Sequence, residues 1–90
     1  MEKSLNIAIS GKVQNVGFRW AAKKQAAALN LRGFARNRPD GILYIEAEGE
    51  DADLEKFLDW CKNGPAYARV KSVRAEEGPV KRFKGFEIAG

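Results

Sequence analysis

One short segment of the sequence, from Gly11 to Arg19, contains residue types suited to binding an anion. Asn15 and Gly17 both tolerate a positive φ, so their alternation can curl the chain into a concave nest of backbone N–H groups. Arg19 stands at the start of a predicted helix, where free N–H groups and the helix dipole favour negative charge. Its guanidinium can bind two phosphate oxygens while the nest binds the others. The alternative is an ordinary strand-to-helix turn in which Arg19 is solvated.

The chain has 90 residues and no histidine, which excludes Ser-His and Cys-His catalysis and most zinc sites. Its single cysteine, Cys61, cannot form an intramolecular disulfide. The Gly11–Arg19 segment is not a nucleotide P-loop, because no Gly-Lys-Ser/Thr sequence follows a glycine at the required spacing. No N-terminal apolar stretch resembles a signal peptide or a membrane span, so we expect a cytoplasmic protein.

The charges are distributed unevenly along the chain, which has a net charge of +4. Residues 1–38 carry eight basic residues and one acid, whereas residues 40–59 carry eight acids and one base. A basic first block suggests an anionic partner, such as nucleic acid, an acidic surface or a phosphorylated small molecule. The alternative is a solvated surface with ordinary mixing of charges.

The first half of the chain predicts a strand, a helix and then a hairpin of two strands. Alternation of apolar and polar residues from Leu5 to Ile9 is typical of a strand that ends at Gly11. Residues 19–30 are rich in Ala, Lys and Gln, which favours a helix. A short strand over 31–37 then leads into the turn Arg38-Pro39-Asp40-Gly41. The returning strand, 43–48, has one apolar and one polar face, the polar face carrying Tyr44, Glu46 and Glu48.

The second half predicts one helix and two strands. Apolar residues at Leu54, Phe57, Leu58 and Cys61 follow the i, i+3, i+4, i+7 spacing of an amphipathic helix. This helix begins near Asp51 or Asp53 and stops at Gly64-Pro65, which makes Cys61 a core residue. Val70, Val73 and Ala75 indicate a strand, Gly78-Pro79 a turn, and Phe83, Phe86 and Ile88 a short final strand.

This order of elements predicts an α+β fold, a ferredoxin-like sandwich that occupies residues 1–90 as a single domain. Two helices pack on one face of a mostly antiparallel sheet, in the order βαββαβ with an extra C-terminal strand. The first crossover makes strands one and two parallel, so the Gly11–Arg19 segment and the hairpin turn share one edge. Four arginines are expected in or beside the segments that meet there: Arg19, Arg32, Arg36 and Arg38.

Two long motifs of the sequence resemble those of the acylphosphatase family. Residues 9–19, with the sequence ISGKVQNVGFR, are similar to the first family signature, GxVQGVGFR. Residues 33–41, GFARNRPDG, followed by Gly49, resemble the second motif, and Gly64-Pro65 with Ala68, Val70 and Val73 form a third, weaker match. The similarity spans essentially the whole chain. This sequence departs from the pattern at Asn15, where the family has Gly, and at Leu43, where it usually has Val.

The resemblance implies a ferredoxin-like enzyme that hydrolyses the carboxyl-phosphate bond of acyl phosphates to a carboxylate and inorganic phosphate, with no metal or cofactor. It implies that Arg19 binds the phosphate and that Asn37 positions the attacking water. The phosphate cradle would be the backbone of Gln14, Asn15, Val16, Gly17, Phe18 and Arg19. The leaving carboxylate is a weak base, so the reaction needs no general acid and tolerates the absence of histidine.

Two alternatives compete with this reading. RNA-recognition modules share the same order of elements, and Arg32-Gly33-Phe34-Ala35 resembles the opening of their RNP1 motif. The residues that follow do not continue this motif, and Glu46 and Glu48 would place negative charge on the face where RNA should bind. A second alternative is a family member kept as a phosphate-binding or carbamoyl-phosphate-handling module.

We expect a monomer that binds a small acyl phosphate, with no nucleic acid or membrane partner. Trp20 and Trp60 are predicted to pack in or at the edge of the core.

Overall fold

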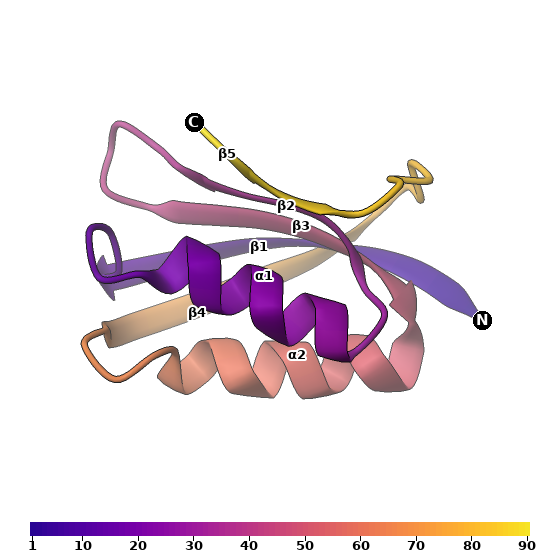
Figure 1. The fold of residues 1–90 in the computed structure, drawn as a ribbon, viewed down its shortest axis with the longest axis horizontal. Helices are drawn as coiled ribbons and strands as arrows, with labels where there is room; N and C mark the ends of the chain where they lie inside the picture. Colours follow the sequence, from indigo (N-terminus) through magenta and orange to yellow (C-terminus); the bar gives the residue numbers. More distant parts are fainter.

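The computed structural model describes all 90 residues, which form five strands and two helices (Figure 1). In chain order these are β1 (Glu2–Lys12), α1 (Phe18–Ala28), β2 (Arg32–Asn37), β3 (Leu43–Glu50), α2 (Asp51–Asn63), β4 (Arg69–Gly78) and β5 (Phe86–Ala89). The order βαββαβ with an extra C-terminal strand is the predicted one. Neither helix is long and apolar enough to cross a membrane.

The five strands form one sheet in the order β4-β1-β3-β2-β5. β1 pairs antiparallel with both β3 and β4, and β2 pairs antiparallel with β3 and parallel with β5. β1 and β2 therefore run in the same direction with β3 between them, as the crossover rule predicts. Both helices cover one face of the sheet and leave the other face open (Figure 1). The predicted ferredoxin-like sandwich is confirmed.

The core lies between this sheet and the two helices. Alternate residues of the central strands, among them Ile7 and Ile45, are fully buried against the helices. They meet Phe18 from α1 and Phe57 from α2. Cys61 is also fully buried, as predicted, and burial raises the pKa of its thiol to about 12.

The two tryptophans differ in their packing. Trp60 lies against Phe18 and Phe57, with ring centroids 5.4 and 5.9 Å away, so its predicted core packing is confirmed. The same prediction is wrong for Trp20, which is 68% exposed. The buried face of α1 is formed by Phe18, Ala22 and Ala26. Trp20 is two residues from Phe18, about 200° around the helix, and therefore points away from the core.

The end of the chain departs from the prediction at one aromatic residue. The last strand begins at Phe86, so Phe83 lies outside it. The ring of Phe83 packs edge-on against Phe34 on the open face of the sheet, at 5.8 Å, and its backbone N–H is bound by Glu48 rather than by a neighbouring strand.

The acidic residues on the predicted polar face of β3 are buried. Glu46 and Glu48 do lie on the open face, but they are 6% and 0% exposed. They are covered by residues 79–85, which connect β4 to β5 and are called the strap below. Because β4 and β5 lie at opposite edges of the sheet, this connection must pass across the strands between them. The polar face of β3 is therefore buried by a segment with no regular structure of its own.

Candidate active site

The loop before α1, the β2–β3 turn and the C-terminus all lie at the same end of the sheet (Figure 1). The side chain of Gln14 joins the loop to the turn, because its Nε2 donates to the carbonyl oxygens of Arg38, at 2.8 Å, and Ile42, at 3.2 Å. The turn is closed by a hydrogen bond of 2.8 Å from the Arg38 N–H to the Ile42 carbonyl. Gln14 thus fixes the loop against the segment that follows Asn37.

The loop has the backbone conformation expected of a nest. Asn15 and Gly17 have φ values of 60° and 76°, so left-handed residues alternate at these positions. Gly17 is also the residue that precedes α1. No backbone N–H from Gln14 to Arg19 donates a hydrogen bond within the protein. The segment therefore presents a run of free donors at the N-terminus of a helix, an arrangement that favours an anion.

A hollow of about 110 Å³ opens beside this loop. Its lining joins residues that are far apart in the sequence: Val13, Asn15, Gly17, Phe18, Arg19, Trp20 and Asn37. The structure thus brings Arg19 and Asn37 together, as expected from the resemblance. Drug-sized ligands occupy sites of about 300–1,000 Å³, so this hollow suits a group as small as a phosphate.

Arg19 carries the positive charge of this hollow. Its Nη1 donates to the carbonyl oxygen of Ala89 at 3.1 Å, so the last residue of β5 orients the guanidinium. No carboxylate lies within ion-pair distance of Arg19. Because one N–H is held by a neutral carbonyl, the guanidinium keeps its full charge and its remaining donors for a ligand.

Asn37, at the end of β2, supplies the neutral polar group of the hollow. Its Oδ1 atom is buried and accepts no hydrogen bond from the protein. Most buried side-chain acceptors in folded proteins have a partner, so an acceptor without one requires a reason. Its place in the lining of the hollow, beside Arg19, provides one.

Of the four arginines expected in or beside the segments that meet, Arg19 alone lines this hollow, Arg38 lies in the β2–β3 turn, and the expectation is wrong for Arg32. Arg32 stands at the other end of β2 and pairs with Glu2 at 2.6 Å. Arg36 points to the open face and lies over the ring of Tyr44 at 5.7 Å. Arg38 pairs with Asp40 inside the turn at 2.7 Å. Side chains alternate along a strand, so Arg36 and Asn37 necessarily point to opposite faces.

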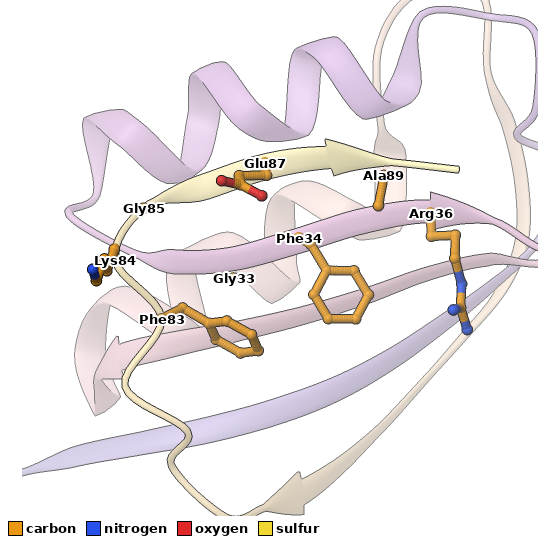
Figure 2. Close-up of a pocket in the computed structure, with 8 residues that line it drawn as sticks. All are labelled: Gly33, Phe34, Arg36, Phe83, Lys84, Gly85, Glu87 and Ala89. Atoms are coloured by element: carbon orange, nitrogen blue, oxygen red, sulfur yellow. The ribbon is translucent and has the colours of Figure 1, made fainter.

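The largest hollow of the molecule, about 450 Å³, lies on the open face and contains neither Arg19 nor Asn37 (Figure 2). It runs between β2, β5 and the end of the strap. Its lining consists of Gly33, Phe34, Arg36, Phe83, Lys84, Gly85, Glu87 and Ala89. The smaller hollow is nevertheless the candidate active site, because it combines free backbone donors, an unpaired guanidinium and an unsatisfied amide oxygen. No group of three or more His, Cys, Asp or Glu side chains is arranged to hold a metal ion.

Sequence reasoning missed three contributors to this site. Gln14 was expected to contribute only its backbone N–H group, whereas its side-chain amide binds two carbonyl groups. Trp20 lines the hollow, which its position beside Arg19 could have suggested. The carbonyl oxygen of Ala89 has no sequence signal, because any residue type presents a backbone oxygen and only the sheet pairing brings this one near Arg19.

Comparison with known proteins identifies relatives over the whole chain. A family model described as acylphosphatase matches residues 5–88. An acylphosphatase from Archaeoglobus fulgidus is 41% identical over 86 residues, which cover 96% of this chain and 97% of that protein. The crystal structure of acylphosphatase from Bacillus subtilis superposes with a TM-score of 0.95 at 32% identity, covering 100% of both chains.

The same unit also forms part of a longer protein. The structure of full-length HypF in a phosphate- and nucleotide-bound form contains a similar segment, with a TM-score of 0.93 and 37% identity, covering 100% of this chain and 12% of that one. The family model and the relatives that match along their full length nevertheless share one description. This chain therefore belongs to the acylphosphatase family and is a hydrolase of acyl phosphates.

Proposed function

We propose that the hollow beside the loop is the active site, where the phosphate group of an acyl phosphate binds between the guanidinium of Arg19 and the backbone N–H groups of Gln14–Arg19. The observation that carries this proposal is that a single hollow contains both Arg19 and Asn37, next to backbone donors that no group of the protein uses. A phosphoryl group is the ligand that matches several fixed donors and one guanidinium in so small a space.

The cradle lowers the barrier through charge and position. The transition state of phosphoryl transfer spreads negative charge over the equatorial oxygens of the transferring group. Donors that are already oriented stabilise that charge without reorganising during the reaction. The nest holds its shape through the positive φ of Asn15 and Gly17, and the carbonyl of Ala89 holds Arg19.

Asn37 positions the attacking water. Its Oδ1 accepts a hydrogen bond from a water molecule, whose oxygen then attacks phosphorus while the bond from phosphorus to the acyl oxygen breaks. The carboxylate leaves with the electron pair of that bond. A neutral amide cannot act as a strong base, so the proton of the water passes to solvent or to a phosphate oxygen. The conjugate acid of the leaving carboxylate has a pKa of about 4, so the carboxylate leaves without being protonated and neither route requires a titrating side chain.

Asn15 keeps the cradle intact in this chain although the family pattern has Gly at that position. Asn adopts the left-handed region more readily than most residues, and its φ of 60° lies within that region. Asn15 is among the residues that line the hollow, so its amide lies close to the proposed phosphate site.

The test is the release of inorganic phosphate from acetyl phosphate or benzoyl phosphate in the presence of a chelator, with spontaneous hydrolysis subtracted. Arg19→Ala is expected to lower kcat/KM by about 10²–10³-fold, the usual cost of removing a donor to a developing oxyanion. Arg36→Ala is the matched control, because Arg36 precedes Asn37 but faces away from the hollow, and it should retain wild-type activity. Normal activity of a folded Arg19→Ala protein would refute the assignment.

We further propose that the chain acts as a monomer in the cytoplasm and binds no nucleic acid. The groups assigned to the reaction, Arg19, Asn37 and the loop N–H groups, already meet within one chain, so the proposed mechanism uses no residue of a second copy. Light scattering at assay concentration tests the monomer, and fractionation of the source cells tests the location. A titration with single-stranded RNA at several salt concentrations tests the last point, since a true binder loses affinity steeply as salt rises.

A further inference from the structure

The strap has little spare length. β4 and β5 lie at opposite edges of the sheet, so the strap must span four interstrand spacings, or about 19 Å. From Gly78 to Phe86 the chain makes eight steps, which reach at most about 26–29 Å when fully extended. The point at which the strap is held on the sheet therefore affects where β5 begins.

Glu48 holds the strap at its middle. This carboxylate is fully buried on the open face, and its two oxygens accept hydrogen bonds from the backbone N–H groups of Lys81, at 2.8 Å, and Phe83, at 2.5 Å. A nitrogen of the Arg32 guanidinium lies 3.7 Å from the same carboxylate. Only Arg82 separates the two N–H groups, so a single carboxylate fixes both the distance of the strap from the sheet and its direction.

Glu46 and two aromatic rings reinforce this attachment. Glu46 accepts hydrogen bonds from the Lys81 ammonium, at 2.8 Å, and from the Tyr44 hydroxyl, at 2.7 Å. The Phe83 ring packs on Phe34, from which point the strap runs through Lys84 and Gly85 into β5 (Figure 2). The carbonyl of Gly85 then accepts a hydrogen bond from the Gly33 N–H at 2.9 Å.

The proposed reaction does not use Glu48, yet a buried carboxylate is costly to maintain. A buried ionic contact often contributes no more stability than apolar residues of similar size, whereas it does specify one geometry. Here the specified geometry leads to the active site. β5 has only four residues, pairs with β2 alone and ends at Ala89, whose carbonyl accepts the hydrogen bond from Arg19.

We propose that Glu48 is a positioning residue for acyl phosphate hydrolysis: it fixes the strap, and through β5 it fixes the Ala89 carbonyl that orients Arg19. This inference rests on the proposed role of Arg19 in binding phosphate. Glu48 acts from the opposite face of the sheet and from the opposite end of β2, where Arg32 pairs with Glu48 in the sheet register.

The test is Glu48→Gln, which keeps the size of the side chain but leaves only one amide oxygen and turns an amide NH₂ toward a backbone N–H. With rates normalised to the folded fraction, we expect KM and the inhibition constant of inorganic phosphate each to rise on the order of tenfold, because a small displacement of a binding group is costly. A residue with only a structural role would change the folded fraction and leave both constants at wild-type values. Glu50→Gln, at the exposed end of β3, is the control and should change neither constant.

Two further variants make the test independent of the stability of Glu48→Gln. Lys81→Ala removes the exposed side chain whose ammonium binds Glu46 and keeps the backbone N–H that binds Glu48, so we expect a smaller rise in the same two constants. Truncation after Ile88 removes the carbonyl that holds Arg19, and it should raise both constants by itself. Combining it with Glu48→Gln should add nothing further, because both changes act through the same contact.

The outcomes separate the two proposals. If the wild type hydrolyses acyl phosphates, Arg19→Ala does not, and folded Glu48→Gln and Lys81→Ala both keep wild-type constants, the positioning role is wrong while the proposed site stands. Fully additive effects of Glu48→Gln and the truncation would also overturn it. If Arg19→Ala keeps full activity, the proposed site itself is wrong.

Discussion

The loop before α1 and the strap are two irregular segments that both present backbone N–H groups, and they differ in what accepts them. In the strap, the N–H groups of Lys81 and Phe83 are bound by the buried carboxylate of Glu48. In the loop, the N–H groups from Gln14 to Arg19 have no acceptor within the protein. The N–H groups of the strap are bound by an anion that the protein itself supplies from β3, so the strap is a structural element. The loop has the same kind of donors without an internal anion, which leaves them available to a substrate.

Each segment contains a non-glycine residue at positive φ, Arg82 in the strap having a φ of 61°, but the contacts that hold their shapes differ. Positive φ values at Asn15 and Gly17 and the amide of Gln14 shape the loop, so its conformation does not depend on an acceptor for its N–H groups. The conformation of the strap depends on carboxylate contacts from β3. Changes to the loop should therefore affect the reaction more than stability, and changes to the strap contacts should affect stability as well.

After Arg19, the largest expected effect concerns Asn37 in the hollow. Asn37→Ala should lower kcat by about 10²-fold, comparable to the loss of one preorganised hydrogen-bonding group. KM and phosphate inhibition should stay near wild type, because Arg19 and the N–H groups that we propose to bind the phosphate remain. Steady-state kinetics with benzoyl phosphate measure this, with Asn63→Ala at the exposed end of α2 as the control. A rise in KM with unchanged kcat would contradict the role in positioning water.

Phosphate binding should stabilise the fold through the loop beside Arg19. Inorganic phosphate that binds only the folded protein adds about 2.7 kcal/mol to the free energy of unfolding at a concentration of 100 times Kd. Urea unfolding with and without phosphate measures this gain. Arg19→Ala should lose most of it, whereas Glu50→Gln should keep it. An equal gain in the wild type and in Arg19→Ala would place the phosphate outside the hollow.

Removing the Glu48 carboxylate that binds the strap should reduce the stability of the fold. Glu48→Ala takes away the acceptor of two backbone N–H groups, and we expect a loss of about 2 kcal/mol in the free energy of unfolding. Glu50→Ala, whose partner is the exposed N-terminal ammonium, should cost no more than about 0.5 kcal/mol. Chemical denaturation compares the two variants. Equal losses would mean that the strap contacts contribute little.

Backbone strain in the loop should have a smaller effect. Asn15→Ala places a residue without special tolerance at a φ of 60°, which costs about 1 kcal/mol. Asn15→Gly keeps that φ without strain and should preserve both stability and turnover. Denaturation and activity measurements on the two variants test this. A loss of activity in Asn15→Gly would show that the Asn15 amide itself contributes to the reaction.

The smallest effect should be the pH dependence of the strap. Burial alone would raise the pKa of Glu46, but hydrogen bonds from Lys81 and Tyr44, with the charges of Lys81 and Arg36, outweigh it and hold the pKa below its ordinary value. Such a carboxylate stabilises the fold above its unfolded pKa, about 4.3, and this contribution is lost as pH falls through the lower folded value. The stability difference between wild type and Glu46→Gln should therefore shrink below about pH 4.3. A difference independent of pH would refute this.

Much of the fold was predictable because each element has local causes. The apolar spacing of Leu54, Phe57 and Cys61 predicted α2, and Gly64 after it takes a φ of 67° where the helix ends. The turn between β2 and β3 followed from Pro39, Asp40 and Gly41. The candidate site was predicted through its motifs, and the structure brings Arg19 and Asn37 into one hollow.

The errors arose where a residue's surroundings depend on a distant segment. Glu46 and Glu48 alternate with apolar residues and therefore looked solvent-exposed, yet the strap covers them. Arg36 lies in the second motif, but strand alternation turns it away from Asn37 and the hollow. Trp20 looked like a core residue from its type, while the helical position of its neighbours leaves it exposed.

The sequence by itself determined the order of the elements, the family and the identity of the candidate site residues, because periodicity, turn chemistry and motif spacing are local properties of the chain. Only the tertiary structure decided which N–H groups remain free and which are bound. That distinction depends on the strand order, which sends the connection from β4 to β5 across the open face and brings the Ala89 carbonyl to Arg19. A hydrogen bond between residues 70 positions apart in the chain has no local signature, since it exists only once the sheet has formed.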